Sequence, residues 1–136
     1  MQEVEIRRAL VIQIGLRETG ALTLIKGLLM MGLFKSDEIQ FLSDPPLREL
    51  EQTIKKFRND LNNEEKVSFV MTYYSGPAIE VKGVLNVFYD AQSKFPIESS
   101  LRQLFRTKRN MYNIALYDCP RPIQGNRYAG RGGGLI

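Results

Sequence analysis

The chain of 136 residues contains 19 lysines and arginines against 15 aspartates and glutamates, and it contains no histidine. The commonest general base near neutral pH is therefore missing, and Ser-His and Cys-His catalysis cannot operate within the chain. The single cysteine, Cys119, excludes an internal disulfide and a metal site built from several cysteines. We expect no cofactor and no bound metal.

The length suits one domain, and no apolar run reaches the roughly 20 residues that a membrane-spanning helix requires. The N-terminus, MQEVEIRRALVIQIG, is typical of the start of a strand and not of a secretory signal. We therefore expect an intracellular protein of a reducing compartment, cytoplasmic or organellar, with no membrane insertion.

The first elements combine a buried strand with an unusually apolar helix. Residues 9–15, ALVIQIG, predict a strand that is apolar on both faces. Residues 20–34 have helix length, and Lys26 is their only charge. Such a helix is either well covered by its own domain or meets a partner on one side. In the second case, the candidate interface residues are Leu28, Leu29, Met30 and Met31.

The middle of the chain alternates strands with an amphipathic helix. Residues 38–44 and 66–74 have the composition of strands, the second strongly so because it is β-branched and aromatic. Residues 47–61 carry apolar side chains at spacings of three and four, which predicts a helix with one buried stripe. Residues 79–91 predict a hairpin that turns at Lys82-Gly83.

The last third predicts a helix that starts at Pro96 and a final strand over 111–118, followed by an irregular Gly/Arg-rich tail over 122–136. The outer face of this helix carries Arg102, Arg106 and Arg109. A basic face is usually solvated, and docking on an acidic protein surface or on RNA are the alternatives.

Strands that alternate with amphipathic helices predict a three-layer α/β/α fold, with a mostly parallel sheet, helices on both faces and an inserted β-hairpin. Ligands of such sheets bind beyond the carboxyl ends of the strands. We expect Gly15, Ser75-Gly76-Pro77 and Asp118-Cys119-Pro120 to lie near one edge.

Four strings in this order resemble the caspase/metacaspase family of cysteine peptidases. They are RRALVIQIG, LIKGLLMMGLFKSDEIQFLSD, FVMTYYSGPAIEVKGVLNVFYDA and NIALYDCPR. The resemblance spans roughly residues 7–121 and implies a caspase-like domain of the large-subunit type over 1–121. The strands that active members add after the nucleophile have no counterpart here.

The resemblance also implies that the catalytic pair has been lost. In the family, the histidine of an SGHG motif is the base and the cysteine of a D-x-C motif is the nucleophile. These positions correspond to Pro77 and Pro120, and proline has neither a proton-transfer group nor a backbone N–H. A shift of one residue would place the free thiol of Cys119 at the nucleophile position, still without a base. We therefore expect no enzymatic activity.

Two carboxylates match family positions associated with an acidic pocket for basic side chains. They are Asp118, which is the better match, and Asp90. Either they form a remnant pocket for arginine or lysine, or each simply caps a turn or a helix end.

These observations favour a non-catalytic caspase-like pseudopeptidase. It would act as an interaction or structural subunit of a larger protein assembly, or as the regulator of an active relative. An exposed edge at the final strand would offer a pairing site for such a partner. The alternatives are a basic domain associated with RNA or nucleoprotein, and a residual enzyme that uses carboxylate, lysine and tyrosine chemistry.

Overall fold

The computed structural model describes residues 6–15, 20–64, 67–90, 92–104 and 111–119. The predicted boundary at residue 121 and the tail over 122–136 lie outside these residues. Within them, four parallel strands form a sheet in the order β2-β1-β3-β7. Their bounds are β1 (Ile6–Gln13), β2 (Ile39–Ser43), β3 (Val67–Ser75) and β7 (Tyr112–Asp118).

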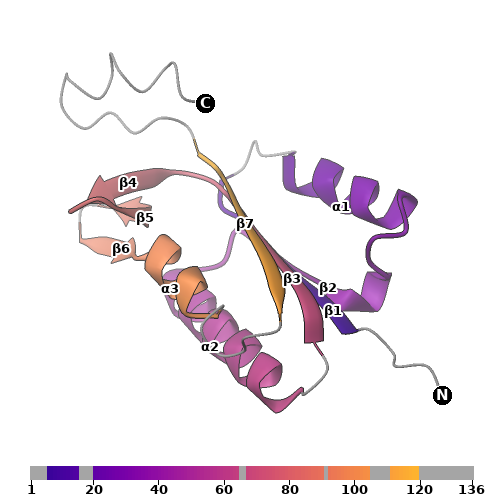
Figure 1. Ribbon diagram of the computed structural model, residues 1–136. Coiled ribbons are helices and arrows are strands. Elements are labelled where there is room, and N and C mark those ends of the chain that lie inside the picture. The colour runs from indigo at the N-terminus through magenta and orange to yellow at the C-terminus, as the bar shows by residue number, and fades with distance from the viewer. Residues whose placement is uncertain (1–5, 16–19, 65–66, 91, 105–110, 120–136) are drawn as a thin grey trace.

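Helices cover both faces of this sheet (Figure 1). On one face lies α1 (Gly20–Met30), and on the other lie α2 (Leu47–Asn63) and α3 (Ile97–Leu104). A short 3₁₀ turn, η1 (Ser36–Glu38), leads into β2. The predicted α/β class, with a mostly parallel sheet between two helical layers, is confirmed.

A second, antiparallel sheet is inserted between β3 and α3. It consists of β4 (Ala78–Val81), β5 (Val84–Asp90) and β6 (Ser93–Phe95) in that order. The predicted turn at Lys82-Gly83 is confirmed: both residues have positive φ, 52° and 79°, as a two-residue type I′ hairpin requires. The sequence analysis missed the third strand, β6.

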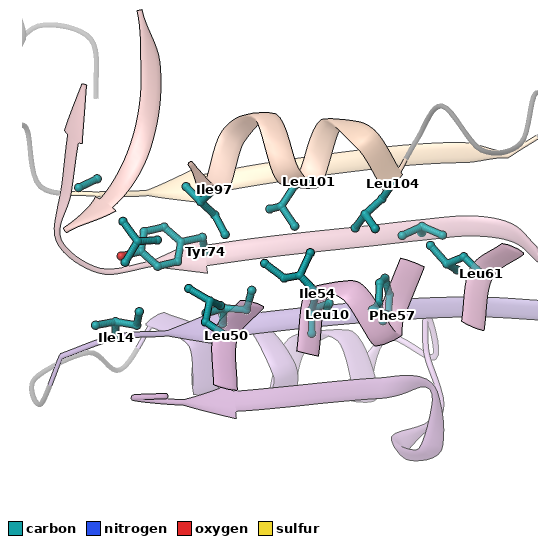
Figure 2. Packing of buried hydrophobic residues seen from close by; sticks show 14 of the residues in the cluster. Leu10, Ile14, Leu50, Ile54, Phe57, Leu61, Tyr74, Ile97, Leu101 and Leu104 are labelled. Atoms are coloured by element: carbon teal, nitrogen blue, oxygen red, sulfur yellow. The ribbon is translucent and has the colours of Figure 1, made fainter. Parts of the chain in front are cut away.

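The larger part of the core lies between the sheet and the pair α2 and α3 (Figure 2). Leu10 from β1 and Tyr74 from β3 are fully buried there. They meet side chains from both helices, namely Leu50, Ile54, Phe57, Leu61, Ile97, Leu101 and Leu104. The predicted stripe of α2 is thus the buried one. Full burial of each large apolar side chain stabilises the fold by about 1.5–3 kcal/mol.

The other face packs against α1 and the segment that follows it. Phe34 stacks on Phe69 of β3, with ring centroids 5.6 Å apart. The helix predicted over 20–34 is shorter, because the N–H of Gly32 bonds to the carbonyl of Leu29 and that of Leu33 to the carbonyl of Leu28. With Gly32 at φ +70°, this is a Schellman motif, which ends a helix.

Candidate functional site

The strand register brings a row of polar side chains together where the four parallel strands end. Gln13 pairs with Ser43 on one side and with Ser75 on the other, and Ser75 pairs with Asp118. We call this row and the loops beyond it the carboxyl edge. Neighbouring parallel strands place paired residues on the same face. All four side chains therefore lie on the face of α1, like Val11 and Tyr73, which precede Gln13 and Ser75 by two residues.

The loops beyond the strands are tied to one another by backbone hydrogen bonds. The N–H of Ile14 bonds to the carbonyl of Ser75 over 2.9 Å, and that of Gly76 bonds to the carbonyl of Asp118 over 3.4 Å. The expectation that these strand ends meet at one edge is thus confirmed for the described residues. The third residue of the last tripeptide, Pro120, lies outside them.

Tyr74 and Gly76 fix the loop that follows β3. The buried hydroxyl of Tyr74 donates a 2.7 Å hydrogen bond to the carbonyl of Pro77. Gly76 has φ +154°, and a Cβ there would lie 2.7 Å from both the carbonyl oxygen of Ile14 and the hydroxyl of Tyr74. Only glycine fits this position without displacing a neighbour. Burial also raises the pKa of Tyr74 far above its usual value, which keeps the hydroxyl protonated as a donor.

Pro77 occupies the place at this edge where the resemblance implies a catalytic base. Its ring has no titratable group, and its carbonyl already accepts hydrogen bonds from Tyr74 and from the N–H of Phe88. It can therefore neither transfer a proton nor donate to an oxyanion. The second implied catalytic position, Pro120, is not among the described residues.

Cys119 follows β7 and is half-buried against the core on the face of α2 and α3. Tyr74 and Tyr117 lie near Cys119. The negative charge of a Cys119 thiolate would raise the pKa values of both phenols further. Burial is the main cause that raises the pKa of Tyr117, to about 12.

The two candidate acidic residues lie in different sheets. Asp118 ends β7 in the four-stranded sheet, and its Oδ2 accepts a 2.9 Å hydrogen bond from the hydroxyl of Tyr73. Asp90 ends β5, and its Oδ1 accepts a 2.8 Å hydrogen bond from the N–H of Gln92. This bond to the residue two positions ahead is the geometry of an aspartate that caps a turn.

Two polar atoms of the carboxyl edge are buried without a hydrogen-bond partner in the described part of the chain. They are Oγ of Ser75 and Oε1 of Gln13. Such groups usually bind water or a polar ligand. They can hydrogen-bond such a molecule, but neither exchanges a proton near neutral pH. The only signal in the sequence was a lone glutamine within an apolar strand, and the sequence analysis did not use it.

A third link holds β2 to this edge. Asp44, at φ +49°, directs its N–H to the carbonyl of Gln13 over 2.6 Å, while its Oδ1 accepts the N–H of Gly15 over 3.3 Å. Aspartate tolerates this left-handed conformation better than most residues. The sequence analysis placed Asp44 only at the end of a predicted strand.

The candidate interface at the end of α1 requires one correction. Leu28 is only 4% exposed, because it packs with Ala9, Phe34 and Met71. The following residues do face solvent, most of all Met30, which is 86% exposed, together with Leu29, Met31 and Leu33. Helical periodicity places Leu28 toward the sheet and its neighbours away from it.

Of the basic residues predicted on the outer face of the third helix, the structure describes Arg102. It is exposed and forms a 3.0 Å ion pair with Glu98, one turn earlier on α3. Arg106 and Arg109 lie outside the described residues.

The strand β7 forms an edge of the four-stranded sheet and presents an apolar face. Tyr112, Ile114 and Leu116 are 81%, 43% and 41% exposed. They alternate along the strand and pair with Phe69, Met71 and Tyr73, so they extend the face on which α1 lies. We call these three residues the β7 patch. The sequence analysis expected an open edge here but did not identify these side chains.

The described residues contain no group of three or more cysteines and carboxylates positioned to hold a metal ion. Among the same residues, no helix combines the length and the apolar character needed to cross a membrane.

The chain matches no protein-family model, and a search of curated proteins finds no match either. The resemblance to caspases is therefore a hypothesis that rests on the four sequence strings.

Proposed function

We propose that this chain is a non-catalytic, caspase-like pseudopeptidase that serves as a structural subunit of a larger protein assembly, in a reducing compartment. In this proposal, a strand of a partner protein pairs with the free side of β7. The observation that carries it is the β7 patch, an apolar face on an edge strand.

Several properties of β7 suit it to pairing. It runs for seven residues and pairs with β3 in unbroken register, so no bulge twists it away from a partner. It contains neither lysine nor proline, the residues that commonly protect edge strands. Within the described residues, no strand lies on its other side. A partner strand would gain backbone hydrogen bonds there, and its side chains would pack beside those of the patch.

The chemistry of the carboxyl edge supports the non-catalytic part of the proposal. The chain has no histidine, and Pro77 stands where the resemblance implies the base. Other residues of the carboxyl edge stabilise its shape. Tyr73 and Tyr74 do so through side-chain hydrogen bonds, and Gly76 through its close packing and its backbone hydrogen bond.

The first test is the native mass of a tagged copy in its own cell extract. The proposal expects a particle of fixed stoichiometry, well above the 15.6 kDa of the chain. Ile114→Lys should release the chain from that particle, because it places a charge in the centre of the β7 patch. The matched control is Val81→Lys, which changes a 37% exposed apolar residue of the other sheet and should stay assembled.

Three results would contradict the proposal in different ways. A free chain near its own mass would remove the structural role. A small complex with an active caspase-like peptidase would favour the regulator instead. Hydrolysis of arginine-, lysine- or aspartate-ending peptides that Cys119→Ala abolishes would show that the chain is an enzyme. Circular dichroism of each variant verifies that it remains folded.

A further inference from the structure

A groove of about 480 Å³ lies between α2 and α3, on the face of the sheet opposite to α1. Figure 1 shows the two helices side by side there. Ile54 of α2 and Phe95 of β6 contribute apolar surface to the groove. Gln52 on α2 and Ser100 and Gln103 on α3 contribute side-chain hydrogen-bonding groups.

Three cations line this groove along α2: Arg48, Lys55 and Arg58. Their spacing of seven and three residues keeps them on one face of the helix, over about 15 Å. Glu51 is the only carboxylate among the described residues that line the groove, so the formal charges of these residues sum to +2, from three cations and one anion. The groove thus combines an apolar surface with a positive rim.

The cations of the groove differ from the other basic residues of the two helices in how they are paired. Lys56 forms a 3.0 Å ion pair with Asp60, and Arg102 forms one with Glu98. Within the described residues, Arg48 and Lys55 have neither an ion pair nor a hydrogen bond. Arg58 donates to the neutral amide oxygen of Gln103, over 3.2 Å, and to no carboxylate of the part of the chain that the structure describes.

We propose that this groove binds an acidic peptide segment of another protein. Carboxylates of the segment pair with Arg48, Lys55 and Arg58, and an apolar side chain between them covers Phe95. A peptide fits better than a phosphate chain, because an apolar side chain of a peptide can cover the exposed surface of Phe95, which a phosphate backbone cannot do. This interaction is independent of the β7 patch and goes beyond the structural role.

The direct test uses fluorescence anisotropy with a labelled peptide rich in aspartate and glutamate around a central leucine. A peptide with asparagine and glutamine in their place is the neutral probe, and single-stranded polyuridine is the nucleic acid probe. The acidic peptide should bind at least about tenfold more tightly than the neutral one. Shifts of backbone amide resonances should centre on Phe95, Ser100 and Gln103.

Charge reversal in the groove distinguishes a specific peptide-binding site from nonspecific electrostatic attraction between the acidic peptide and the basic protein. Lys55→Glu and Arg58→Glu should each weaken binding of the acidic peptide, and the two together should weaken it at least about tenfold. Lys56→Glu is the matched control, because Lys56 neighbours Lys55 but is paired with Asp60 outside the groove lining. It should change the affinity less than about twofold. Ile114→Lys should leave peptide binding unchanged, so failure of the β7 proposal and of this one are distinguishable.

The proposal is overturned if the acidic peptide binds no better than the neutral one, or if Lys56→Glu weakens it as much as the groove variants. Tighter binding of polyuridine, lost in the groove variants, would overturn it in favour of a nucleic acid site.

Discussion

The hydroxyl of Tyr73 in β3 donates a 2.9 Å hydrogen bond to Oδ2 of Asp118 in the neighbouring strand β7. The bond is diagonal, because Tyr73 pairs in register with Leu116 and Asp118 pairs with Ser75. It holds the edge strand to the centre of the sheet at the carboxyl edge. It also occupies one oxygen of the carboxylate that the resemblance would assign to an acidic pocket for basic side chains.

This bond predicts a measurable coupling between the two side chains. Tyr73→Phe removes the donor, and Asp118→Asn removes the charge that strengthens the bond. Because the phenol is buried and its acceptor is charged, we expect each variant to lower the free energy of unfolding by about 1–2 kcal/mol. The double variant should lose about 0.5–2 kcal/mol less than the sum of the two. Urea denaturation measures all four proteins, and strictly additive losses would show that the bond contributes nothing.

The loop after β3 predicts contrasting effects for two glycines. Gly76→Ala places a Cβ 2.7 Å from the carbonyl of Ile14 and from the hydroxyl of Tyr74, at a φ that L-residues avoid. We expect a loss of at least about 2 kcal/mol, from backbone strain and the displaced hydrogen bond. Gly27→Ala is the control, since it lies inside α1 with open space around its Cβ position. It should stabilise the protein by about 0.5–1 kcal/mol, because alanine favours a helix.

Thermal or urea denaturation distinguishes the two glycine variants. A Gly76→Ala protein as stable as the wild type would mean that the loop at Pro77 is not held as described.

The half-buried phenols of Tyr89 and Tyr117 predict a loss of stability at alkaline pH. Burial is the main cause that raises the pKa of both Tyr89 and Tyr117, from 10.0 to about 12. The unfolded chain releases these protons from about pH 10, whereas the folded chain keeps them until about pH 12. Their contribution is therefore complete below pH 10 and is lost as the pH rises from 10 to 12.

Urea denaturation across this range, for the wild type and for Tyr89→Phe with Tyr117→Phe, measures the effect. The double variant should lose less stability between pH 10 and pH 12 than the wild type does. Identical pH profiles would contradict the assignment. Because Tyr89 also donates a 2.8 Å hydrogen bond to the carbonyl of Pro45, the variant should start from a lower stability at pH 7.

Features governed by local pattern were predictable from the sequence. The stripe of α2, the buried strands β1 and β3 and the turn at Lys82-Gly83 each follow from short-range rules of periodicity and turn chemistry. The meeting of the strand ends followed from the alternation of strands and helices, since parallel strands share their carboxyl edge.

Features set by tertiary contacts were not predictable in the same way. The end of α1 depends on Gly32, which looked like one more small residue in an apolar run. β6 is three residues long and exists through its pairing with β5. The orphan oxygens of Gln13 and Ser75 became visible only once the register placed them side by side. In the sequence, the cations of the α2–α3 groove look like any other basic residues of an exposed helix face. The groove that they line forms only when α3 packs beside α2.

The β7 patch predicts how the isolated protein behaves without a partner. An edge strand with exposed Tyr112, Ile114 and Leu116 should pair with other copies, so we expect purified protein to associate as its concentration rises. Ile114→Lys should suppress this association, because pairing would bring the charged side chain of each copy against the apolar side chains of the next strand. Val81→Lys adds the same charge elsewhere and should not suppress it. Sedimentation of the three proteins over a range of concentrations measures the difference. A wild type that stays monomeric would show that the free side of β7 is not a pairing surface. If both lysine variants reduce association equally, net charge governs solubility, and the free side of β7 is again not a pairing surface.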